Sequence, residues 1–132
     1  DEQEDLVFVV GGIGITPCIS IIDQLTHDND PRTLRLYYSN QKEEDIVFWE
    51  RLQTLQKANE RLSVHSHITR EDTVSEPHKK GRFAVAKILQ DIPDAENTLF
   101  FLCGSTAFTK DIWKQLHDAG VPAENLYTED FY

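Results

Sequence analysis

The stretch LVFVVGGIGITP at residues 6–17 decides the fold, because it contains a strand, a glycine turn and a helix start in direct succession. Its first five residues are all apolar and mostly β-branched, which is typical of a strand buried on both faces. The glycines at 11, 12 and 14 allow a tight turn and a close approach of the backbone to a ligand. Thr16 is placed as a helix N-cap and Pro17 as the first helical residue. The stretch therefore predicts the first β–α unit of a parallel sheet.

The same alternation of short apolar runs and helix-period segments continues along the chain. It predicts further strands at 34–38, 62–69, 98–103 and 126–131, with helices around 18–25, 43–55, 85–89 and 108–119. Strands that alternate with helices indicate a parallel sheet covered on both faces. We therefore expect a three-layer α/β/α fold with a five-stranded parallel sheet in the order 3-2-1-4-5. The first and fourth strands would be central, and the alternating third strand would lie at an edge.

This strand order creates a switch point between the first and fourth strands, where ligands of open α/β sheets bind. Both strands run into a glycine and a helix start: the first into Gly11, and the fourth into the run Cys103-Gly104-Ser105-Thr106. Free backbone N–H groups and the helix dipole at such a terminus attract phosphate. Two turns of this kind side by side suit a dinucleotide.

The glycine motif alone does not establish a dinucleotide site. Pro17 replaces the third small residue of the dinucleotide fingerprint, and Ser39-Asn40 stand where an acid would end the second strand. One glycine-rich turn is also common in α/β domains of other function. The residues by themselves therefore indicate a phosphate-binding α/β domain.

Composition limits the other functions. The 132-residue chain has a formal net charge of −10 and a pI near 4.8, which argues against a nucleic-acid partner. No apolar run approaches the roughly 18–20 residues of a membrane span. The two cysteines, Cys18 and Cys103, lie 85 positions apart without metal-ligand spacing, so no disulfide framework or zinc site is predicted. A reducing cytoplasmic setting fits best.

Three further features of the sequence do not support a metal site, a phosphatase or a hydrolase. His65 and His67 share one strand face, but without a third ligand an exposed edge-strand face is expected rather than a metal site. A phosphatase loop after Cys103 would need an arginine where Thr109 stands. The Gly-x-Ser-x-Gly motif of hydrolases is missing from the sequence.

Four motifs together resemble the ferredoxin–NADP reductase superfamily, over essentially the whole chain. They are the run GGIGITP at 11–17, the strand end YYSN at 37–40, the pair Cys103-Gly104, and the closing segment from Gly120-Val121-Pro122 to Phe131. Their order and spacing are similar to those of that superfamily's pyridine-nucleotide domain. The resemblance implies a single NAD(P)-binding domain over 1–132, the C-terminal half of a longer reductase.

The resemblance also implies roles for individual residues. Cys103 would border the nicotinamide as a packing and polarising residue, and Glu129 and Phe131, or Tyr132 in its place, would face the flavin. Ser105 stands where family members usually carry proline and adds a donor for phosphate. The implied cofactor-binding residues are Gly11, Gly12, Gly14, Thr16, Pro17, Ser39, Thr69, Arg70, Gly104, Ser105, Thr106 and Phe108.

The choice of nucleotide rests on the segment after the third strand. Thr69-Arg70 stand where NADPH-using members place Ser-Arg on the 2′-phosphate, and Lys79, Lys80 and Arg82 follow. Glu71 and Asp72 adjoin them and oppose this interpretation. NADPH is favoured, with NADH as the alternative.

The function implied is hydride transfer from nicotinamide to FAD and onward electron transfer. FAD would be bound mainly by a β-barrel domain of the same parent chain, so this domain alone is expected to be inactive. The acceptor would be an iron–sulfur protein, a haem, a ferric chelate or a membrane carrier. The expected location is cytoplasmic, at the cytoplasmic face of a membrane if the parent protein has spans. A non-catalytic nucleotide-binding or redox-sensing module is the alternative, which Cys103, Glu129 and Phe131 disfavour.

Overall fold

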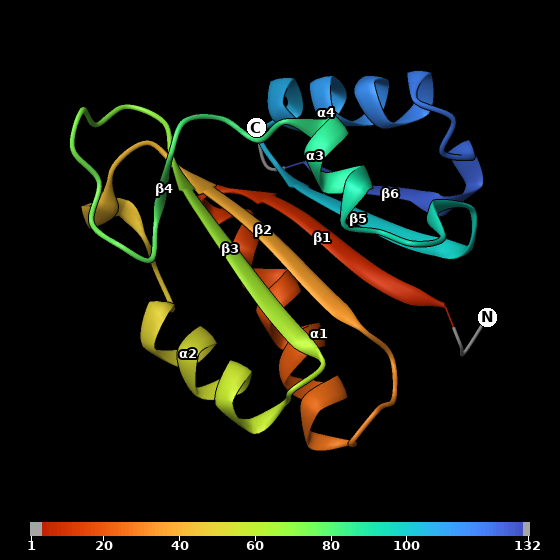
Figure 1. The fold of residues 1–132 in the computed structure, drawn as a ribbon, viewed down its shortest axis with the longest axis horizontal. Helices are drawn as coiled ribbons and strands as arrows, with labels where there is room; N and C mark the ends of the chain where they lie inside the picture. Colours follow the sequence, from red (N-terminus) through yellow and green to blue (C-terminus); the bar gives the residue numbers. More distant parts are fainter. Residues whose placement is uncertain (1–3, 131–132) are drawn as a thin grey trace.

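Six parallel strands and four α-helices build the chain in the computed structural model, which describes residues 4–130 (Figure 1). The strands are β1 (Asp5–Gly11), β2 (Leu34–Asn40), β3 (Leu62–Ile68), β4 (Lys79–Lys80), β5 (Thr98–Gly104) and β6 (Leu126–Asp130). The α-helices are α1 (Ile15–His27), α2 (Trp49–Ala58), α3 (Val85–Gln90) and α4 (Thr106–Asp118). Short 3-10 turns are η1 (Gly12–Gly14), η2 (Glu43–Asp45), η3 (Ala95–Asn97) and η4 (Ala123–Asn125).

The sheet order is β4-β3-β2-β1-β5-β6, so the five strands expected from the sequence stand in the expected order. The expectation that the third strand is an edge is wrong. The two-residue strand β4 pairs with the end of β3, through His67 with Lys79 and Ile68 with Lys80. A strand this short has no periodicity to detect, which is why the sequence did not predict it.

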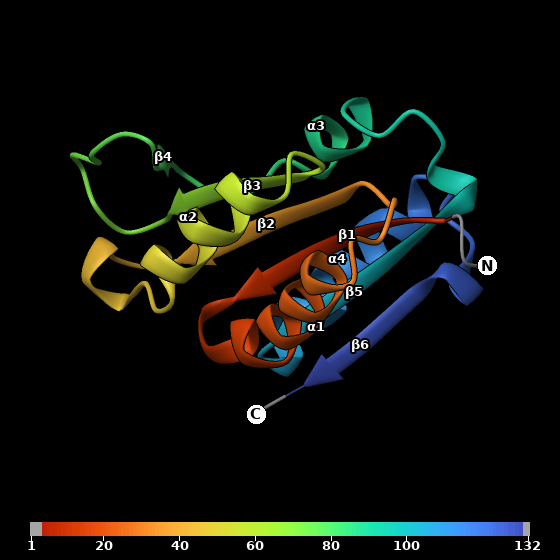
Figure 2. The same cartoon turned by 90° about the horizontal axis from the view of Figure 1, so that it is seen from below.

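Alternate residues of β1 face the two helix layers, because successive side chains of a strand point to opposite faces. Leu6, Phe8 and Val10 pack with residues of α1 and α2, whereas Val7 and Val9 pack with residues of α3 and α4. Figure 2 shows α1 lying across β1 and β5 on one side of the sheet. All five of these side chains are at most 2% exposed, which explains the continuous apolar run.

The second helix begins later than the sequence predicts. The acidic run Glu43–Asp45 forms the separate turn η2, and α2 starts only at Trp49. Phe48 precedes α2 with a φ of 62°, a left-handed conformation that interrupts any continuous helix, and its side chain is 45% exposed. Phe48 therefore belongs to the loop and not to the helix that the sequence predicted around 43–55.

The helix α4 ends in a glycine stop. Gly120 has a φ of 104°, and its N–H donates to the His117 carbonyl, while the Val121 N–H donates to the Leu116 carbonyl. This pair of hydrogen bonds is a Schellman motif. Pro122 follows and leads the chain through η4 into β6.

Between residues 4 and 130, no helix combines the length and the apolar character needed to cross a bilayer.

Candidate functional site

The first glycine turn joins β1 to α1 at the carboxyl end of the sheet. Gly12 has a φ of 54°, which favours glycine. Gly14 has an ordinary φ of −60°, but a Cβ there would lie 2.6 Å from the carbonyl carbon and oxygen of Cys103. Glycine is thus required at 12 by conformation and at 14 by the close approach of α1 to β5.

The helix start differs from the prediction that Thr16 is the N-cap and Pro17 the first helical residue. Gly14 is the N-cap of α1, no side chain caps it, and both predicted residues lie in the first turn. The turn η1 is already helical, so it continues into α1 without the extended residue that a hydroxyl cap needs. The first-turn N–H groups therefore lack a side-chain acceptor.

The second turn, between β5 and α4, is capped by a side chain. Ser105 is extended, and its Oγ accepts a hydrogen bond of 3.2 Å from the Phe108 N–H. The Phe108 ring packs over both turns, since a Cβ at Gly11 or Gly104 would lie 3.3 or 3.0 Å from it. The ring thereby joins the ends of β1 and β5.

A cavity of about 890 Å³ opens where these turns meet the loops after β2 and β3. The predicted residues that line it are Gly11, Gly12, Ser39, Thr69, Arg70, Ser105 and Phe108. Its walls come from four different strand ends. The cavity therefore lies at the switch point expected from the strand order.

Other predicted residues do not line the cavity. They are Gly14, Thr16, Pro17, Cys103, Gly104, Thr106 and Glu129. Cys103 is 5% exposed near the end of β5, and Glu129 pairs with it in register on β6. Phe131 and Tyr132 fall outside the described residues, so their predicted flavin contact stays a prediction.

Sequence reasoning missed a further part of the wall. These lining residues are Ile13, Asn40, Gln41, Asp45, Val47, Arg82, Phe83, Ala107, Asp111, Ile112 and Gln115. Asn40 is 5% exposed, and its Nδ2 has no hydrogen-bond acceptor within residues 4–130. A polar residue ending the apolar strand β2 was the available signal for Asn40. The basic run at 79–82 was the signal for Arg82.

The two arginines of the cavity carry its positive charge. Arg70 and Arg82 are both exposed, and neither guanidinium forms an ion pair within the described residues. Asp45 and Asp111 line the same cavity. The wall thus offers two free cations to an anionic ligand, against two carboxylates.

The histidines of β3 do not form the exposed face that the sequence predicted. His65 stacks on Tyr37 with ring centroids 4.6 Å apart, and His67 meets the edge of Phe83 at the same distance. Burial lowers the pKa of both imidazoles. Within residues 4–130, no three side chains of the His, Cys, Asp or Glu type gather where a metal ion could sit.

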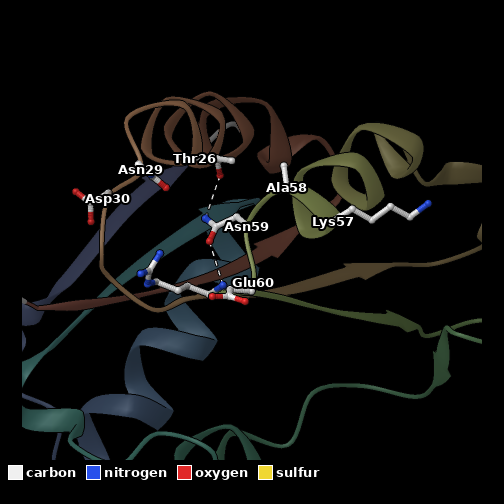
Figure 3. A pocket seen from close by; sticks show the side chains of 8 residues that line it. Thr26, Asn29, Asp30, Lys57, Ala58, Asn59 and Glu60 are labelled. Atoms are coloured by element: carbon white, nitrogen blue, oxygen red, sulfur yellow. Dashed lines mark hydrogen bonds between the residues drawn. The ribbon is translucent and has the colours of Figure 1, made fainter.

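A second hollow, of about 200 Å³, lies between the end of α1 and the start of β3 (Figure 3). Asn59 crosses it: its Nδ2 donates to Thr26 Oγ1 at 3.1 Å, and its Oδ1 accepts from the Arg61 N–H at 3.0 Å. The amide is satisfied by protein groups. We therefore interpret this hollow as the place where Asn59 links the end of α1 to the start of β3, and not as a second ligand site.

A parallel sheet with a cavity at its switch point, walled by two glycine turns, defines a nucleotide-binding α/β domain. The sequence match agrees with this class. The chain belongs to the oxidoreductase NAD-binding domain family, which it matches over residues 8–114. The resemblance to a pyridine-nucleotide domain is thereby confirmed.

Curated relatives are longer than this chain. It is 30% identical over 138 residues to a Na(+)-translocating NADH-quinone reductase subunit from Marinomonas sp. (strain MWYL1), covering 99% of this chain and 33% of that protein. It is 27% identical over 146 residues to the Homo sapiens oxidoreductase NAD-binding domain-containing protein 1, covering 100% of this chain and 47% of that protein. The chain thus spans a third to a half of the length of these relatives.

Solved structures share the whole fold. The flavohemoglobin from Malassezia yamatoensis with bound FAD and heme superposes with a TM-score of 0.88 at 25% identity, over 100% of this chain and 33% of that one. The cytochrome b5 reductase domain of Ulva prolifera nitrate reductase superposes with a TM-score of 0.84 at 23% identity, over 96% of this chain and 50% of that one. The second likeness bears on the fold alone.

Proposed function

We propose that this chain is the pyridine-nucleotide half of a flavin-dependent reductase that passes hydride from a nicotinamide to FAD. The observation that carries the proposal is the cavity at the switch point, walled by both glycine turns. Cys103 and Glu129 lie side by side near the ends of β5 and β6, and Cys103 comes two residues before the lining residue Ser105. The names of two similar proteins, an NADH-quinone reductase component and a flavohemoglobin with bound FAD, support the same reaction class.

The residues of this chain would bind and orient, since the cofactors supply the redox chemistry. When bound, the nicotinamide would supply the hydride and the flavin would be its acceptor. The N–H groups of Gly12 and Ile13, in the turn η1 on the cavity wall, and the hydroxyl of Ser105 are placed to hold the pyrophosphate. Cys103 would pack at the nicotinamide edge without forming a covalent bond to it.

The nucleotide we propose is NADPH. A 2′-phosphate carries two negative charges and binds guanidinium groups in a bidentate fashion. Arg70 and Arg82 line the cavity together with Thr69, and neither arginine is engaged by a carboxylate among the described residues. Asp45 on the same wall opposes the phosphate, so the two arginines must outweigh it.

Calorimetric titration with 2′,5′-ADP and 5′-AMP at low salt tests this proposal. We expect 2′,5′-ADP to bind about tenfold more tightly, and the difference to disappear in Arg70→Ala and shrink in Arg82→Ala. Arg61→Ala is the matched control, because this exposed arginine lies beside the other hollow. Equal binding of both ligands would assign NADH and leave the reductase in place. If the full-length parent protein binds neither ligand, the nucleotide proposal is wrong.

The remaining parts of the proposal concern the parent protein. A flavin-binding domain of the same parent chain would complete the site, and this domain alone would turn over nothing. The electron acceptor would be an iron–sulfur protein, a haem, a ferric chelate or a membrane carrier. The two free thiols support a reducing cytoplasmic compartment, at the face of a membrane if the parent protein has spans.

A further inference from the structure

The two cysteines of the chain lie against each other. Cys18 and Cys103 are 85 positions apart in the sequence, yet their Sγ atoms are 3.3 Å apart and both thiols are free. Cys18 lies in α1, and Cys103 lies near the end of β5. No spacing in the sequence signals this contact, because it is made by the fold.

The backbone fixes this sulfur pair in place. Gly14 packs so closely on β5 that a Cβ there would lie 2.6 Å from the Cys103 carbonyl and 2.8 Å from the Gly104 nitrogen. Cys18 follows one helical turn after Gly14, so the same close approach of α1 and β5 places its thiol on Cys103. The contact therefore follows from main-chain packing rather than from a chance rotamer.

The two thiols have different roles in the contact. Cys18 donates its S–H to the Cys103 sulfur, which lowers the pKa of Cys103 against the opposing effects of burial and of the Glu129 carboxylate. The same hydrogen bond, together with burial, raises the pKa of Cys18. Cys103 is therefore the more acidic sulfur of the pair, and Cys18 is the adjacent thiol that can resolve its oxidised form.

Access to the pair is narrow. Cys103 is 5% exposed and Cys18 is 1% exposed. A small oxidant such as peroxide can reach Cys103, whereas a bulky alkylating reagent is excluded from both thiols in the folded chain. Buried thiols without a neighbouring sulfur would be inert, so the juxtaposition is what gives the pair its chemistry.

We infer that Cys18 and Cys103 form a peroxide-oxidised dithiol that closes to an intramolecular disulfide. The Cys103 thiolate attacks one oxygen of hydrogen peroxide, and the O–O bond breaks. Hydroxide departs as the leaving group, and Cys103 becomes a sulfenic acid. The Cys18 sulfur then attacks the Cys103 sulfur, and the S–O bond breaks as the S–S bond forms. The protons of the two thiols convert both departing hydroxides to water. The sulfur pair loses two electrons, and the peroxide gains them.

The disulfide would tie the start of α1 to the end of β5. Because Cys103 is then bonded through its sulfur, it can no longer pack as a thiol at the nicotinamide edge. This consequence rests on the proposed function, whereas formation of the disulfide does not. Peroxide would thus switch off hydride transfer while the adenosine end of the cavity, around Arg70, stays intact.

The test is to treat the reduced chain with stoichiometric hydrogen peroxide, denature it, and measure free thiols and intact mass. We expect both thiols to disappear together, with loss of the mass of two hydrogen atoms, no dimer on a non-reducing gel, and full reversal by dithiothreitol. In Cys18→Ala, and in the more conservative Cys18→Ser, Cys103 should instead gain oxygen, and its sulfenic acid should be trapped by dimedone that is present during denaturation. In Cys103→Ala, Cys18 should react at least about tenfold more slowly than Cys103 does in the wild type, because it lacks thiolate character.

The inference is overturned if oxidised wild-type chain gains oxygen without losing hydrogen, or if it pairs between chains. It is also overturned if wild type and Cys18→Ala give the same products. Free-thiol content and intact mass report on the two cysteines alone, and their measurement needs no nucleotide or flavin. Calorimetry with 2′,5′-ADP before and after oxidation is a separate measurement, so failure of the nucleotide proposal is distinguishable from failure of the disulfide.

Discussion

Replacement of Gly14 by alanine should destabilise the chain more than its backbone conformation suggests. A Cβ at Gly14 would lie 2.6 Å from the Cys103 carbonyl and 2.8 Å from the Gly104 nitrogen, whereas ordinary contact begins at 3.4 Å. Main-chain atoms of a central strand cannot rotate away, so α1 would have to shift by about 0.8 Å relative to β5. Overpacking of this kind typically costs about 1–3 kcal/mol, and rigid atoms on the far side favour the upper end. We expect a loss of about 3 kcal/mol in the free energy of unfolding.

Gly12→Ala is the matched control. Gly12 has a φ of 54°, but a Cβ there would meet nothing within 4 Å. The substitution should cost about 1–2 kcal/mol, from the left-handed backbone alone. Urea unfolding monitored by circular dichroism gives both values as shifts of the midpoint at constant slope. If Gly14→Ala loses no more stability than Gly12→Ala, the close approach of α1 to β5 is not what requires this glycine.

Three further substitutions test other features by the same unfolding measurement. Ser105→Ala removes the N-cap that accepts from Phe108 and should cost about 1 kcal/mol, while Ser105→Asp should not; equal effects would contradict the cap. Asn125→Ala removes a buried amide that donates to a backbone carbonyl at 2.6 Å, and should cost about 1–3 kcal/mol; a neutral result would contradict that bond. Burial lowers the pKa of His65, so the unfolded chain takes up a proton first as the pH falls, and stability should decline below the ordinary pKa of 6.5. His65→Phe keeps a ring on Tyr37 and should flatten this decline; an unchanged decline would assign it to other groups.

Sequence patterns predicted the parts of the fold that depend on local chemistry. The apolar run of β1 requires burial on both faces, and the structure buries alternate side chains in the two helix layers. Gly120 marks the end of α4 because only the left-handed position there requires glycine. The places of Gly11 and Ser105 on the cavity wall were predictable for the same reason, since turn chemistry is local, whereas Phe108 was predicted from the family resemblance.

Other features depend on contacts that the sequence does not display. Phe48 fits a helical stripe by spacing, yet its left-handed backbone separates the turn η2 from α2. Arg82 reaches the cavity only because the loop after β3 returns along the sheet edge through β4. The meeting of Cys18 with Cys103 needs both the strand order and the tight approach at Gly14. Each of these arises from tertiary packing over a long separation in the chain.

The acidic composition of the chain does not conflict with an anionic ligand. A net charge of −10 repels phosphate at long range, but at physiological salt this repulsion decays over about 8 Å. Inside the cavity the decisive groups are the free guanidinium groups of Arg70 and Arg82 and the backbone N–H groups of Gly12 and Ile13 in the turn η1. Raising the salt concentration should therefore weaken the advantage of 2′,5′-ADP over 5′-AMP, because that advantage depends on exposed arginines. An advantage that grew with salt would mean that these arginines do not contact the phosphate.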